Sequence, residues 1–463
     1  MPFHALLPPL VTLSSVNPHG GGVIATYPTH SADEIRSLLA AAEHAQRAWC
    51  RRTVEDRATL LRAIATALRM HADTLATTAT TEMGKPIAAA RAEVEKCAVC
   101  CEWYADQAPR LVPQAGPRAG DEIRLEALGV LLAIMPWNFP YWQVVRVLAP
   151  ALLVGNAVVL KHAENVTGCA LALEAAVRSA GAPDGVFTVL RIAREQAPPI
   201  IADARIAAVT LTGSERAGAA VGAAAGAALK PTVLELGGSD PFLVWQDVDV
   251  PSVARAAALA RCVNAGQSCI AAKRFLIHDR IYEAFVPAFI EAMRSLKVSD
   301  PRALDTDVGP LVNLAARETL HGQVQRTLDA GAVALLGCRN PGGPTPWYPP
   351  SIVANIPDGS PMSVDELFGP VAGVWRIHDI DEAIARANST RFGLGASVWT
   401  ADRRVAERCA AEFQAGSVMI NQPVVSDPAL PFGGVRSSGY GRELGLAGLT
   451  AFANLKTVRG LPV

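Results

Sequence analysis

The chain has 463 residues, of which 50% are hydrophobic and 18% are charged. A chain this long and this apolar buries a large core, which excludes a disordered protein and allows about three domains. The 42 basic and 43 acidic residues leave a net charge of −1. The sequence therefore predicts no general attraction to nucleic acids or to anionic membranes.

Two features of the sequence favour a cytoplasmic protein. No run of about 18 or more apolar residues is present, and Met1–Leu13 lacks a basic head, so neither a membrane span nor a secretory signal is expected. The nine cysteines are odd in number and scattered, unlike a disulfide framework. Cys97-x-x-Cys100 is a single motif inside a predicted helix, so we expect no metal site.

The N-terminal part of the chain has a helical pattern. From Ser31 to Cys101, apolar residues recur at spacings of three and four. Ser31 and Glu34 form a candidate capping box at the start of this stretch. The segment Thr81–Pro86 interrupts it, because glycine and proline break helices.

Residues 109–128 differ in character from the helical segment before them. Prolines and glycines there separate short alternating stretches such as Glu122–Glu126. This pattern predicts a projecting strand or hairpin that lies outside the core.

From residue 129 onward, apolar runs typical of strands alternate with Ala-rich helical stretches. Strands that are apolar throughout and alternate with helices predict a parallel, doubly wound α/β sheet. The predicted strands cover residues 129–135, 157–160, 207–211 and 232–236, and the predicted helices cover residues 142–153, 167–180 and 214–229.

A second α/β unit is expected from about residue 239, because the alternation resumes there. The Gly- and Pro-rich residues 337–350 are predicted to be a loop between elements of this unit. Its first strands and helices are predicted at residues 241–245, 250–260, 273–277 and 282–296.

Cys269 is the candidate nucleophile among the nine cysteines. Small and polar residues precede it and apolar residues follow it, which suits a turn with a reachable sulfur. A free thiol is mostly protonated at neutral pH, so backbone N–H groups or a nearby base would have to increase the thiolate fraction. The alternative is a buried structural cysteine.

Two polar residues at predicted strand ends are candidates to act with this thiol. Glu235 lies between two leucines, where a carboxylate is costly unless it is paired or serves as a base. Asn138 stands between Pro136 and Pro140 directly after a strand, where a fixed amide can donate to an oxyanion. The alternatives are a salt-bridged structural Glu and an Asn that bonds its own turn.

These three residues belong to an ordered set of motifs along nearly the whole chain. With this set, the chain resembles the aldehyde dehydrogenase superfamily of NAD(P)-dependent enzymes. The strings Tyr141–Arg146 and Lys161–Ala163 look most like the short, bacterial-type succinate-semialdehyde dehydrogenases. The motifs are Glu82–Pro86, Pro136–Pro140, Thr212–Ser214, Leu234–Gly238, Gly266–Cys269, Glu366–Pro370, Pro431–Gly434 and Gly439–Gly445.

The resemblance implies a mechanism for the three candidate residues. Cys269 attacks the aldehyde carbon, and the Asn138 amide together with the Cys269 N–H holds the oxyanion of the thiohemiacetal. The nicotinamide oxidises this adduct to a thioester, and Glu235 deprotonates the water that hydrolyses it. Family members that pass the acyl group to coenzyme A lack this Glu, so its presence favours hydrolysis to an acid.

The resemblance also implies the cofactor site, since no Gly-x-Gly-x-x-Gly fingerprint follows a strand. Thr212–Gly218 opens a helix whose N–H groups suit a pyrophosphate, although Gly-Ser there is also typical of an ordinary cap. Glu164 matches an acidic position that binds ribose hydroxyls and would repel a 2′-phosphate, so NAD is preferred to NADP. His162 is expected to be a packed side chain. The implied cofactor-binding residues are Trp137, Lys161, Glu164, Gly213, Ser214, Gly218, Leu236, Glu366 and Phe368.

Arg146 is the clue to the substrate. It lies eight residues after Asn138 on the predicted helix 142–153, so both side chains can face one pocket. Succinate-semialdehyde dehydrogenases carry Arg here to bind the distal carboxylate, whereas an ordinary helix salt bridge is the alternative. Some of them have a second Arg where this chain has Val263. The candidates to replace that second Arg are Arg261, Lys273, Arg274 and Ser426.

We therefore expect the aldehyde dehydrogenase fold, with a doubly wound cofactor domain, an α/β catalytic domain and a small β arm. The arm is expected to join subunits into a homodimer or homotetramer by strand addition. The expected boundaries are residues 1–108 and 129–238 for the cofactor domain, 239–438 for the catalytic domain, and 109–128 with 439–463 for the arm.

The expected activity is NAD(P)-dependent oxidation of a small aldehyde with a distal carboxylate, with succinate semialdehyde as the first candidate. Glutarate semialdehyde remains an alternative, because one methylene gives only about 1–3 kcal/mol of discrimination. A broad-range aldehyde dehydrogenase is a further alternative. A non-catalytic family member is disfavoured, since a scaffold has no need of the three candidate residues.

Overall fold

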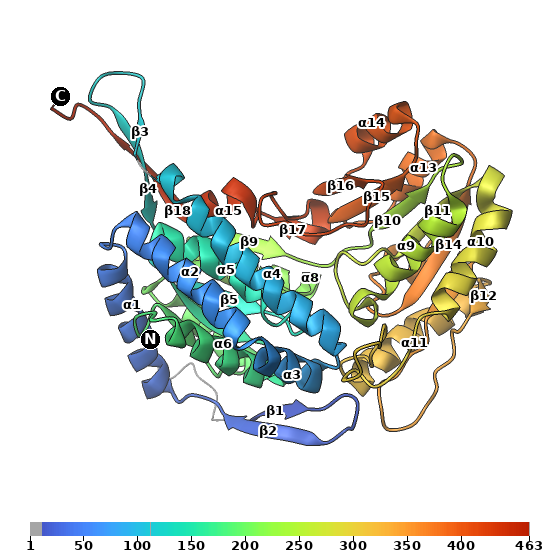
Figure 1. The fold of residues 1–463 in the computed structure, drawn as a ribbon, viewed down its shortest axis with the longest axis horizontal. Helices are drawn as coiled ribbons and strands as arrows, with labels where there is room; N and C mark the ends of the chain where they lie inside the picture. The colour runs from blue at the N-terminus through green and yellow to red at the C-terminus, as the bar shows by residue number, and fades with distance from the viewer. Residues whose placement is uncertain (1–11, 112, 463) are drawn as a thin grey trace.

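The computed structural model describes residues 12–111 and 113–462. These residues form two α/β units, with a small β arm that projects from the first unit (Figure 1). Residues 1–11, which bear on the expected lack of a secretory signal, lie outside the described part. Within the described ranges, no helix is both long enough and apolar enough to cross a bilayer.

The first unit is built on a six-stranded sheet in the order β17-β9-β8-β5-β6-β7. All neighbouring strands are parallel except β17, which pairs antiparallel with β9. The chain leaves β5 toward β6 and β7, and later returns to β8 on its other side, so a topological switch point lies at β5 and β8. The strands are β5 (Val130–Met135), β6 (Ala157–His162), β7 (Phe187–Val189), β8 (Ile206–Thr212), β9 (Thr232–Glu235) and β17 (Gly439–Tyr440).

Helices cover both faces of this sheet, as the strand pattern predicts. Leu131 and Ala133 of β5 pack with α2, α4, α5 and α6, whereas Val130 and Leu132 pack with α1, α7 and α8. The helices are α1 (Ala32–Trp49), α2 (Val54–Met70), α3 (Ala72–Met83), α4 (Ile87–Asp106), α5 (Trp142–Val154), α6 (Thr167–Ser179), α7 (Ala197–Ala202) and α8 (Glu215–Ala227).

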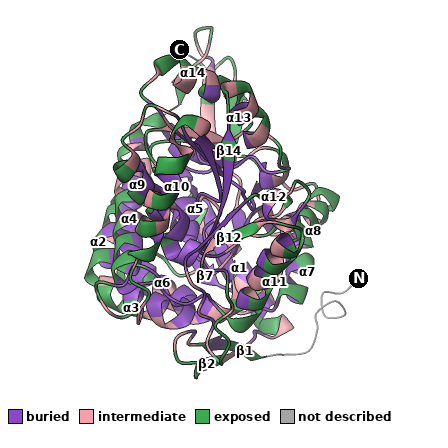
Figure 2. Cartoon of the chain, turned by 90° about the vertical axis from the view of Figure 1, so that its right-hand side faces the viewer, coloured by how far each residue is buried: buried purple, intermediate pink, exposed green. Residues whose placement is uncertain are grey.

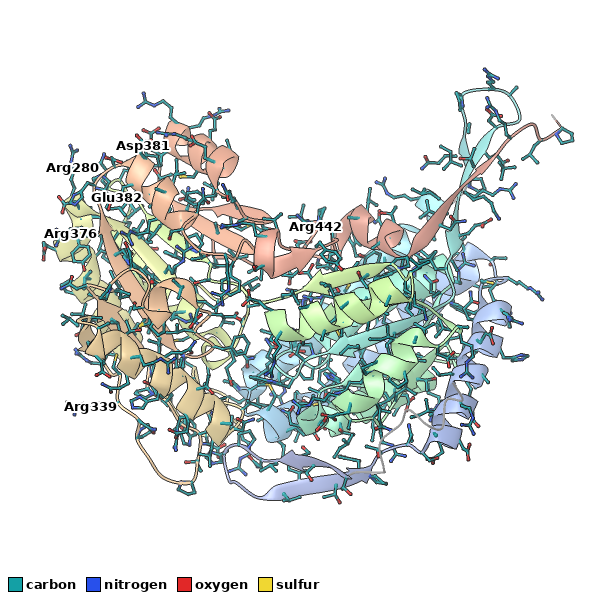
Figure 3. The ribbon with its side chains drawn as sticks, turned by 180° about the vertical axis from the view of Figure 1, so that it is seen from behind. Arg280, Arg339, Arg376, Asp381, Glu382 and Arg442 are labelled. Atoms are coloured by element: carbon teal, nitrogen blue, oxygen red, sulfur yellow. The ribbon has the colours of Figure 1, made fainter. Side chains whose placement is uncertain are left out.

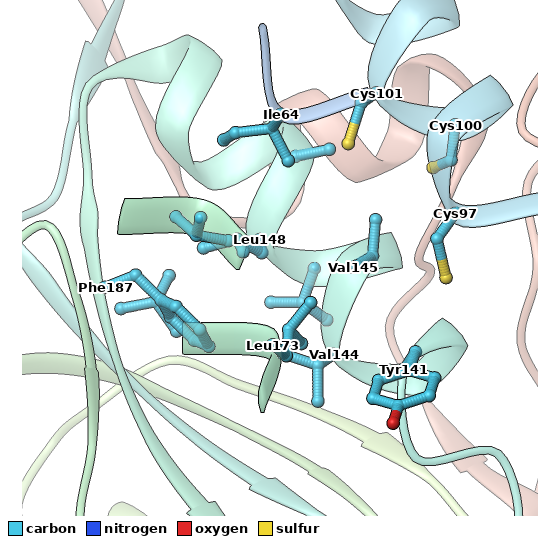
Figure 4. Packing of buried hydrophobic residues seen from close by; sticks show 14 of the residues in the cluster. Ile64, Cys97, Cys100, Cys101, Tyr141, Val144, Val145, Leu148, Leu173 and Phe187 are labelled. Atoms are coloured by element: carbon cyan, nitrogen blue, oxygen red, sulfur yellow. The ribbon is translucent and has the colours of Figure 1, made fainter. Parts of the chain in front are cut away.

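Three buried cysteines of α4 belong to the core between α4 and α5 (Figure 4). Cys97, Cys100 and Cys101 are free thiols, and burial raises the pKa of Cys97 and Cys100 well above the ordinary thiol value. They therefore act as small apolar packing residues. In the described ranges, no group of His, Cys, Asp and Glu side chains is placed to hold a metal ion.

The segment Thr81–Pro86 supports the helices that carry the site. The Glu82 carboxylate accepts hydrogen bonds from the N–H groups of Gly168 and Cys169 at the start of α6, at 3.0 and 2.8 Å. Lys85 forms a buried ion pair with Glu93. The other Glu93 oxygen accepts from the N–H groups of Tyr141 and Trp142, which begin α5. Both carboxylates thus satisfy donors that helix starts leave unpaired.

The second unit contains a seven-stranded sheet in the order β12-β13-β14-β11-β10-β15-β16, parallel except for the β12–β13 pair. Figure 2 shows β14 buried beneath the flanking helices. The strands are β10 (Pro241–Val244), β11 (Arg274–His278), β12 (Val333–Leu336), β13 (Ser351–Ala354), β14 (Val371–Ile377), β15 (Gly395–Trp399) and β16 (Ser417–Ile420). The helices are α9 (Val250–Cys262), α10 (Asp279–Arg294), α11 (Leu314–Asp329), α12 (Pro361–Val364), α13 (Ile380–Ala387) and α14 (Arg403–Glu412).

Charged side chains cover the outer end of this second unit. Arg280, Arg376 and Asp381 lie at its surface (Figure 3). The Arg376 guanidinium pairs with Asp279 and Glu283, so basic and acidic groups are interspersed there. This mixture agrees with the balanced net charge of the sequence.

The arm is a three-stranded antiparallel sheet in the order β18-β4-β3. It joins the segment after residue 109 to the C-terminal strand, and Leu455 is 61% exposed there. Residues 439–452 lie elsewhere, because β17 joins the first sheet and α15 packs against α5. These elements are β3 (Gln114–Ala115), β4 (Glu122–Ala127), β18 (Ala453–Val458) and α15 (Gly445–Ala451).

The element boundaries differ from the predicted ones mainly at polar ends. Ser31 and Glu34 do form a capping box, and α1 begins at Ala32. The strand β6 continues through Lys161 and His162, because both pair in register with the end of β5. A hairpin of β1 (Thr12–Val16) and β2 (Val23–Pro28) precedes α1. The sequence pattern does not predict this hairpin, because most of its side chains are exposed.

Replacing Lys85 by Met should lower the free energy of unfolding by about 3 kcal/mol or more, because it leaves the buried Glu93 carboxylate without its counter-ion. Urea unfolding of both variants measures this cost. Lys297→Met is the matched control, since Lys297 pairs with Asp305 in an exposed position, where a pair is worth about 0–1 kcal/mol. Equal, small losses in the two variants would contradict the role of the buried pair.

Candidate active site

Two cavities meet at Cys269. One has a volume of about 280 Å³ and the other about 290 Å³, and the side chains of Cys269 and Gln143 line both. We name them the first cavity and the second cavity. The first is lined by Pro136, Trp137, Asn138, Gln143, Thr212, Gly213, Ser214, Leu236, Gly237, Cys269, Glu366 and Phe368. The second is lined by Ala89, Ala92, Glu93, Lys96, Phe139, Trp142, Gln143, Arg146, Val263, Ser268, Cys269, Ile270, Val424, Val425, Ser426 and Phe432.

A left-handed turn after α9 brings Cys269 to this junction. Asn264, Ala265 and Gly266 have φ values of 52°, 56° and 73°, a conformation that costs free energy at the two non-glycine positions. A Cβ on Gly266 would lie 2.3 Å from the carbonyl carbon of Gly369, so only glycine fits. The Asn264 amide donates to the Asn138 carbonyl at 2.8 Å, which ties the turn to the end of β5.

Lys273 fixes the backbone on the other side of Cys269. Its ammonium donates to the carbonyls of Ser268, Cys269 and Ala271 at 2.7 to 3.0 Å. The N–H of Cys269 has no hydrogen-bond acceptor in the described part of the chain. That donor is therefore available to a developing negative charge next to the sulfur.

The Cys269 thiol is protonated at neutral pH in this environment. Burial raises its pKa to about 12, and the positive charges of Arg146 and Lys273 oppose this rise only in part. The sulfur therefore has to lose its proton when it attacks, rather than rest as a thiolate.

Asn138 is held in one orientation at the end of β5. Its Nδ2 donates to the Gln267 carbonyl at 3.0 Å, and its Oδ1 accepts from Gln143 Nε2 at 3.0 Å. An amide nitrogen has two hydrogens, so one N–H remains for the first cavity, which Asn138 and Cys269 both line. This arrangement suits an oxyanion donor and differs from an Asn that caps its own turn.

Glu235 ends β9 as a buried acid without a counter-ion. It is 2% exposed, and neither carboxylate oxygen has a hydrogen-bond partner among the described residues. Burial first and the charge of Glu443 second raise its pKa well above the ordinary carboxyl value. Glu235 itself lines neither cavity, but Leu236 and Gly237 directly after it line the first one. Such a carboxylate is a strong base once it is deprotonated.

Arg146 lines the second cavity, but its guanidinium already has protein partners. It forms a buried ion pair with Glu443, and its Nη2 donates to Thr212 Oγ1 at 2.9 Å. The Glu443 carboxylate also accepts from Thr210 Oγ1 at 3.3 Å. The alternative of a salt bridge is thus present in the structure, with a partner from the segment after β17 rather than from the same helix.

The four residues expected to replace a second arginine have different outcomes. Ser426 lines the second cavity, and its expected bond to a substrate carboxylate stays a prediction. Arg261, Lys273 and Arg274 are absent from both cavities, because each is buried and donates to backbone carbonyls; for these three the expectation was wrong. Lys273 and Arg274 each donate to three backbone carbonyls and hold their loops in place, whereas, within the described residues, Arg261 donates to the Gly266 carbonyl alone.

The first cavity contains six of the nine expected cofactor-binding residues. Trp137 and Phe368 meet edge to face at 5.7 Å between ring centroids. Glu366 accepts from the Gly238 N–H at 3.1 Å and lies 3.6 Å from Lys273. The six are Trp137, Gly213, Ser214, Leu236, Glu366 and Phe368.

The other three expected cofactor residues lie around this cavity. Gly218 packs behind Leu236, since a Cβ there would lie 2.6 Å from the leucine side chain. Lys161 is buried near the end of β6, and the exposed Glu164 begins the next turn. His162 is packed as expected, and burial lowers its pKa to about 4.

The residues present fit a dinucleotide. The cavity lies at the carboxyl ends of β5, β8 and β9, next to the switch point where α/β sheets bind such ligands. Ser214 caps α8 through its bond from the Ala217 N–H, and the N-terminus of this helix opens at the cavity.

The sequence model of the aldehyde dehydrogenase family matches residues 10–458. The chain belongs to the aldehyde dehydrogenase family. It is 44% identical to succinate-semialdehyde dehydrogenase (NADP(+)) 1 of Mycobacterium tuberculosis H37Rv over 452 residues, covering 96% of this chain and 99% of that protein. It is also 44% identical to Sad, a succinate semialdehyde dehydrogenase (NAD(P)+) of Escherichia coli K12, covering 96% and 97%.

Solved structures of aldehyde dehydrogenases agree with this assignment. Succinic semialdehyde dehydrogenase from Streptococcus pyogenes in complex with NADP+ superposes with a TM-score of 0.94 at 34% identity, covering 97% of this chain and all of that chain. An NAD-dependent aldehyde dehydrogenase from Sinorhizobium meliloti also gives 0.94 at 34% identity, covering 97% and 91%. The chain is thus an NAD(P)-dependent aldehyde dehydrogenase.

Sequence reasoning missed three side chains of this aldehyde dehydrogenase site. Gln143 orients the Asn138 amide, Glu443 pairs with Arg146, and Lys96 lines the second cavity. Glu443 lies within the motif Gly439–Gly445, which was the available signal. Lys96 lies in an Ala- and Glu-rich helix whose pattern carries no signal of a site.

Arg442, next to Glu443, lies in the segment between the two α/β units (Figure 3). Its guanidinium donates to the carbonyls of Gly434 and Gly441 at 2.8 and 2.6 Å. These bonds anchor the segment that brings Glu443 to α5. The charge of Arg442 also opposes the rise in the pKa of Glu235, as Arg146 does.

Proposed function

We propose that this enzyme oxidises a small aldehyde with a distal carboxylate, succinate semialdehyde first, to the diacid. The observation that carries the proposal is the position of Cys269 between two cavities. The first cavity has six of the nine expected cofactor residues, and the second has Lys96, Arg146 and Ser426. A reacting carbon on the sulfur therefore has the coenzyme on one side and the rest of the substrate on the other.

In the proposed reaction, the Cys269 sulfur bonds to the aldehyde carbon while the thiol proton passes to water in the cavity. The Asn138 amide and the Cys269 N–H donate to the oxygen, which carries the developing negative charge. The nicotinamide coenzyme, when bound, supplies the two-electron oxidation of the adduct to the thioester. Glu235 then takes a proton from water, which attacks the thioester and releases the carboxylic acid and the thiol.

The substrate proposal has two supports. The curated relatives named above are succinate-semialdehyde dehydrogenases, and the second cavity of this chain contains cationic side chains and a hydroxyl. Glutarate semialdehyde is one methylene longer and a neutral aldehyde lacks the carboxylate, so a substrate series separates these cases.

We infer that NAD is the preferred coenzyme. The carboxylates of Glu164 and Glu195 both lie near Lys161 at the end of β6, and Arg194 pairs with Glu195, so Glu164 supplies the uncompensated negative charge at the expected ribose site. A 2′-phosphate would meet this negative charge, whereas ribose hydroxyls can donate to it. The relatives include enzymes named for NADP(+) and for NAD(P)+, so their names do not decide the coenzyme. The support for NAD comes from the acidic residues of this chain.

We also infer a homodimer or homotetramer that forms through the arm. The sheet of β18, β4 and β3 projects from the body with apolar side chains such as Leu455 and Ile123 in solvent. A projecting strand edge of this kind pairs readily with another subunit.

The decisive test is NADH production with a panel of aldehydes. We expect kcat/KM to be highest for succinate semialdehyde, lower for glutarate semialdehyde and lowest for butanal. Cys269→Ala should abolish turnover of all three while it keeps coenzyme binding. A preference for butanal would replace the proposal with a broad-range enzyme, and no turnover of any aldehyde by the wild type would favour a non-catalytic member.

The rate should fall on the acidic side at a pH well above the ordinary carboxyl range. Because the pKa of Glu235 is raised, falling pH protonates it early and removes the base. Glu443→Gln removes a negative charge that raises this pKa and leaves the opposing charge of Arg146 uncompensated. The acidic limb of the pH–kcat profile should therefore move to lower pH.

Glu235→Gln is the control for this experiment, because it should lack the limb and retain only a small residual rate of thioester hydrolysis. Single-turnover measurements separate that step from the steps before it. A limb that stays in place or moves to higher pH in Glu443→Gln would contradict the coupling between the two acids.

Glu164→Gln should raise kcat/KM for NADP about fivefold and change that for NAD much less, since removing one repulsive charge is worth about 1 kcal/mol at an exposed site. Steady-state kinetics with both coenzymes measures the ratio. Glu195→Gln is the matched control, because Arg194 already pairs with that carboxylate at 2.5 Å. An unchanged ratio in Glu164→Gln would refute its role in coenzyme choice.

A further inference from the structure

Two cations line the second cavity, and they differ in their partners. Arg146 is buried and its charge is compensated by Glu443. Lys96 of α4 is half-buried, and no carboxylate in the described part of the chain lies within ion-pair distance of its ammonium. Lys96 is thus the cation of this cavity that lacks a counter-ion.

The Lys96 ammonium lies against an ordered polar and aromatic wall. Its Nζ donates to Ser426 Oγ at 2.9 Å and lies 4.3 Å from the centroid of the Trp142 ring. Trp142 Nε1 donates to the same Ser426 oxygen at 3.0 Å. Three elements far apart in the sequence therefore fix this corner: α4, α5 and the loop after β16.

The remaining hydrogens of this corner can all be donated to an anion. An ammonium has three hydrogens, and Lys96 uses one of them on Ser426. The Ser426 oxygen accepts two bonds, so its own hydrogen remains to be donated. A carboxylate accepts several bonds at once and prefers charged donors, which is the chemistry that this corner offers.

The electrostatic surroundings also favour a bound anion. Burial is the largest effect on Lys96 and lowers the pKa of its ammonium, and the charge of Arg146 lowers it further. Asp427 and the Cys97 and Cys100 thiols raise the pKa of Lys96. A negatively charged group in the cavity would stabilise the charged form of Lys96, which burial alone disfavours.

We propose that Lys96 and Ser426 bind the distal carboxylate of the substrate, whereas Arg146 holds Glu443 in place. This inference rests on the proposed function and names its specificity-determining residue. In this proposal, Lys96 on α4 supplies the positive charge for the carboxylate that an arginine at position 263 would otherwise supply. Lys96 and Cys269 line the same cavity, so the proposal places the carboxylate on Lys96 and the aldehyde carbon at the sulfur.

The test compares succinate semialdehyde with butanal, which has the same carbon chain and a methyl group in place of the carboxylate. Lys96→Met should raise KM for succinate semialdehyde roughly 10- to 100-fold, the usual loss for a hydrogen bond to a charged group. KM for butanal and both kcat values should stay within about twofold. Lys96→Arg should restore most of the affinity, and Lys297→Met at an exposed position is the control.

A structural role for Lys96 predicts a different result. If Lys96 only holds Ser426 and Trp142 in place, Lys96→Met impairs both aldehydes equally, and that outcome would overturn the proposal. An unchanged KM for succinate semialdehyde in Lys96→Met would also overturn the proposal. Arg146 would then be assigned as the residue that binds the carboxylate. Circular dichroism and thermal unfolding of each variant establish that it is folded.

Succinate as an inhibitor keeps this test separate from the proposed function. If the wild type prefers butanal, the proposed substrate is wrong, but competition by succinate against butanal still reports carboxylate binding in the cavity. Lys96→Met should then raise the inhibition constant of succinate roughly 10-fold or more. Inhibition that is equal in wild type and variant would refute the assignment of Lys96.

Discussion

The buried ion pair of Arg146 and Glu443 is the interaction on which the rest of the site depends. A charge in the interior is stable only with a partner, so Arg146 on α5 fixes the segment after β17 against the first sheet. That segment places a second acid close to Glu235, which contributes to its raised pKa. One pair thus links the C-terminal part of the chain, the wall of the second cavity and the acid proposed as base.

The Cys269 thiol and the Glu235 carboxyl share one property, which is that burial raises the pKa of each. Both groups favour their protonated forms, because burial disfavours charge on each. A protein that stores its nucleophile as a thiol reduces oxidation of the sulfur, since the thiolate is the reactive form. The N–H of Cys269 and the Asn138 amide stabilise charge only where the substrate oxygen develops it.

Much of this fold could be predicted from the sequence, because apolar runs report burial directly. The strand at Val130–Met135 and the helix at Trp142–Val154 agree with the predicted ranges to within one residue. The capping box at Ser31 was also predictable, since its two residues are close in sequence. The hairpin of β1 and β2 was not, because an exposed ribbon has no apolar periodicity.

The site could be predicted only in part, because its decisive pairings are not local. Cys269, Asn138 and Glu235 were found from their motifs. Glu443 lies 297 residues after Arg146, and its motif Gly439–Gly445 marks the segment but does not indicate that these two side chains pair. Lys96 was missed for a similar reason. A lysine on a helix normally lies in solvent. Lys96 lines a cavity because Trp142 and Ser426, which are distant in sequence, contact its side chain.

The distance along the chain between Arg146 and Glu443 has a consequence for biosynthesis. Helix α5 is made early, yet its arginine stays uncompensated until the ribosome has produced both α/β units and the segment after them. A nascent chain therefore cannot complete its catalytic pocket before almost all of these residues have emerged. A product of interrupted translation that ends before Glu443 lacks the counter-ion of Arg146, so it cannot form this buried ion pair.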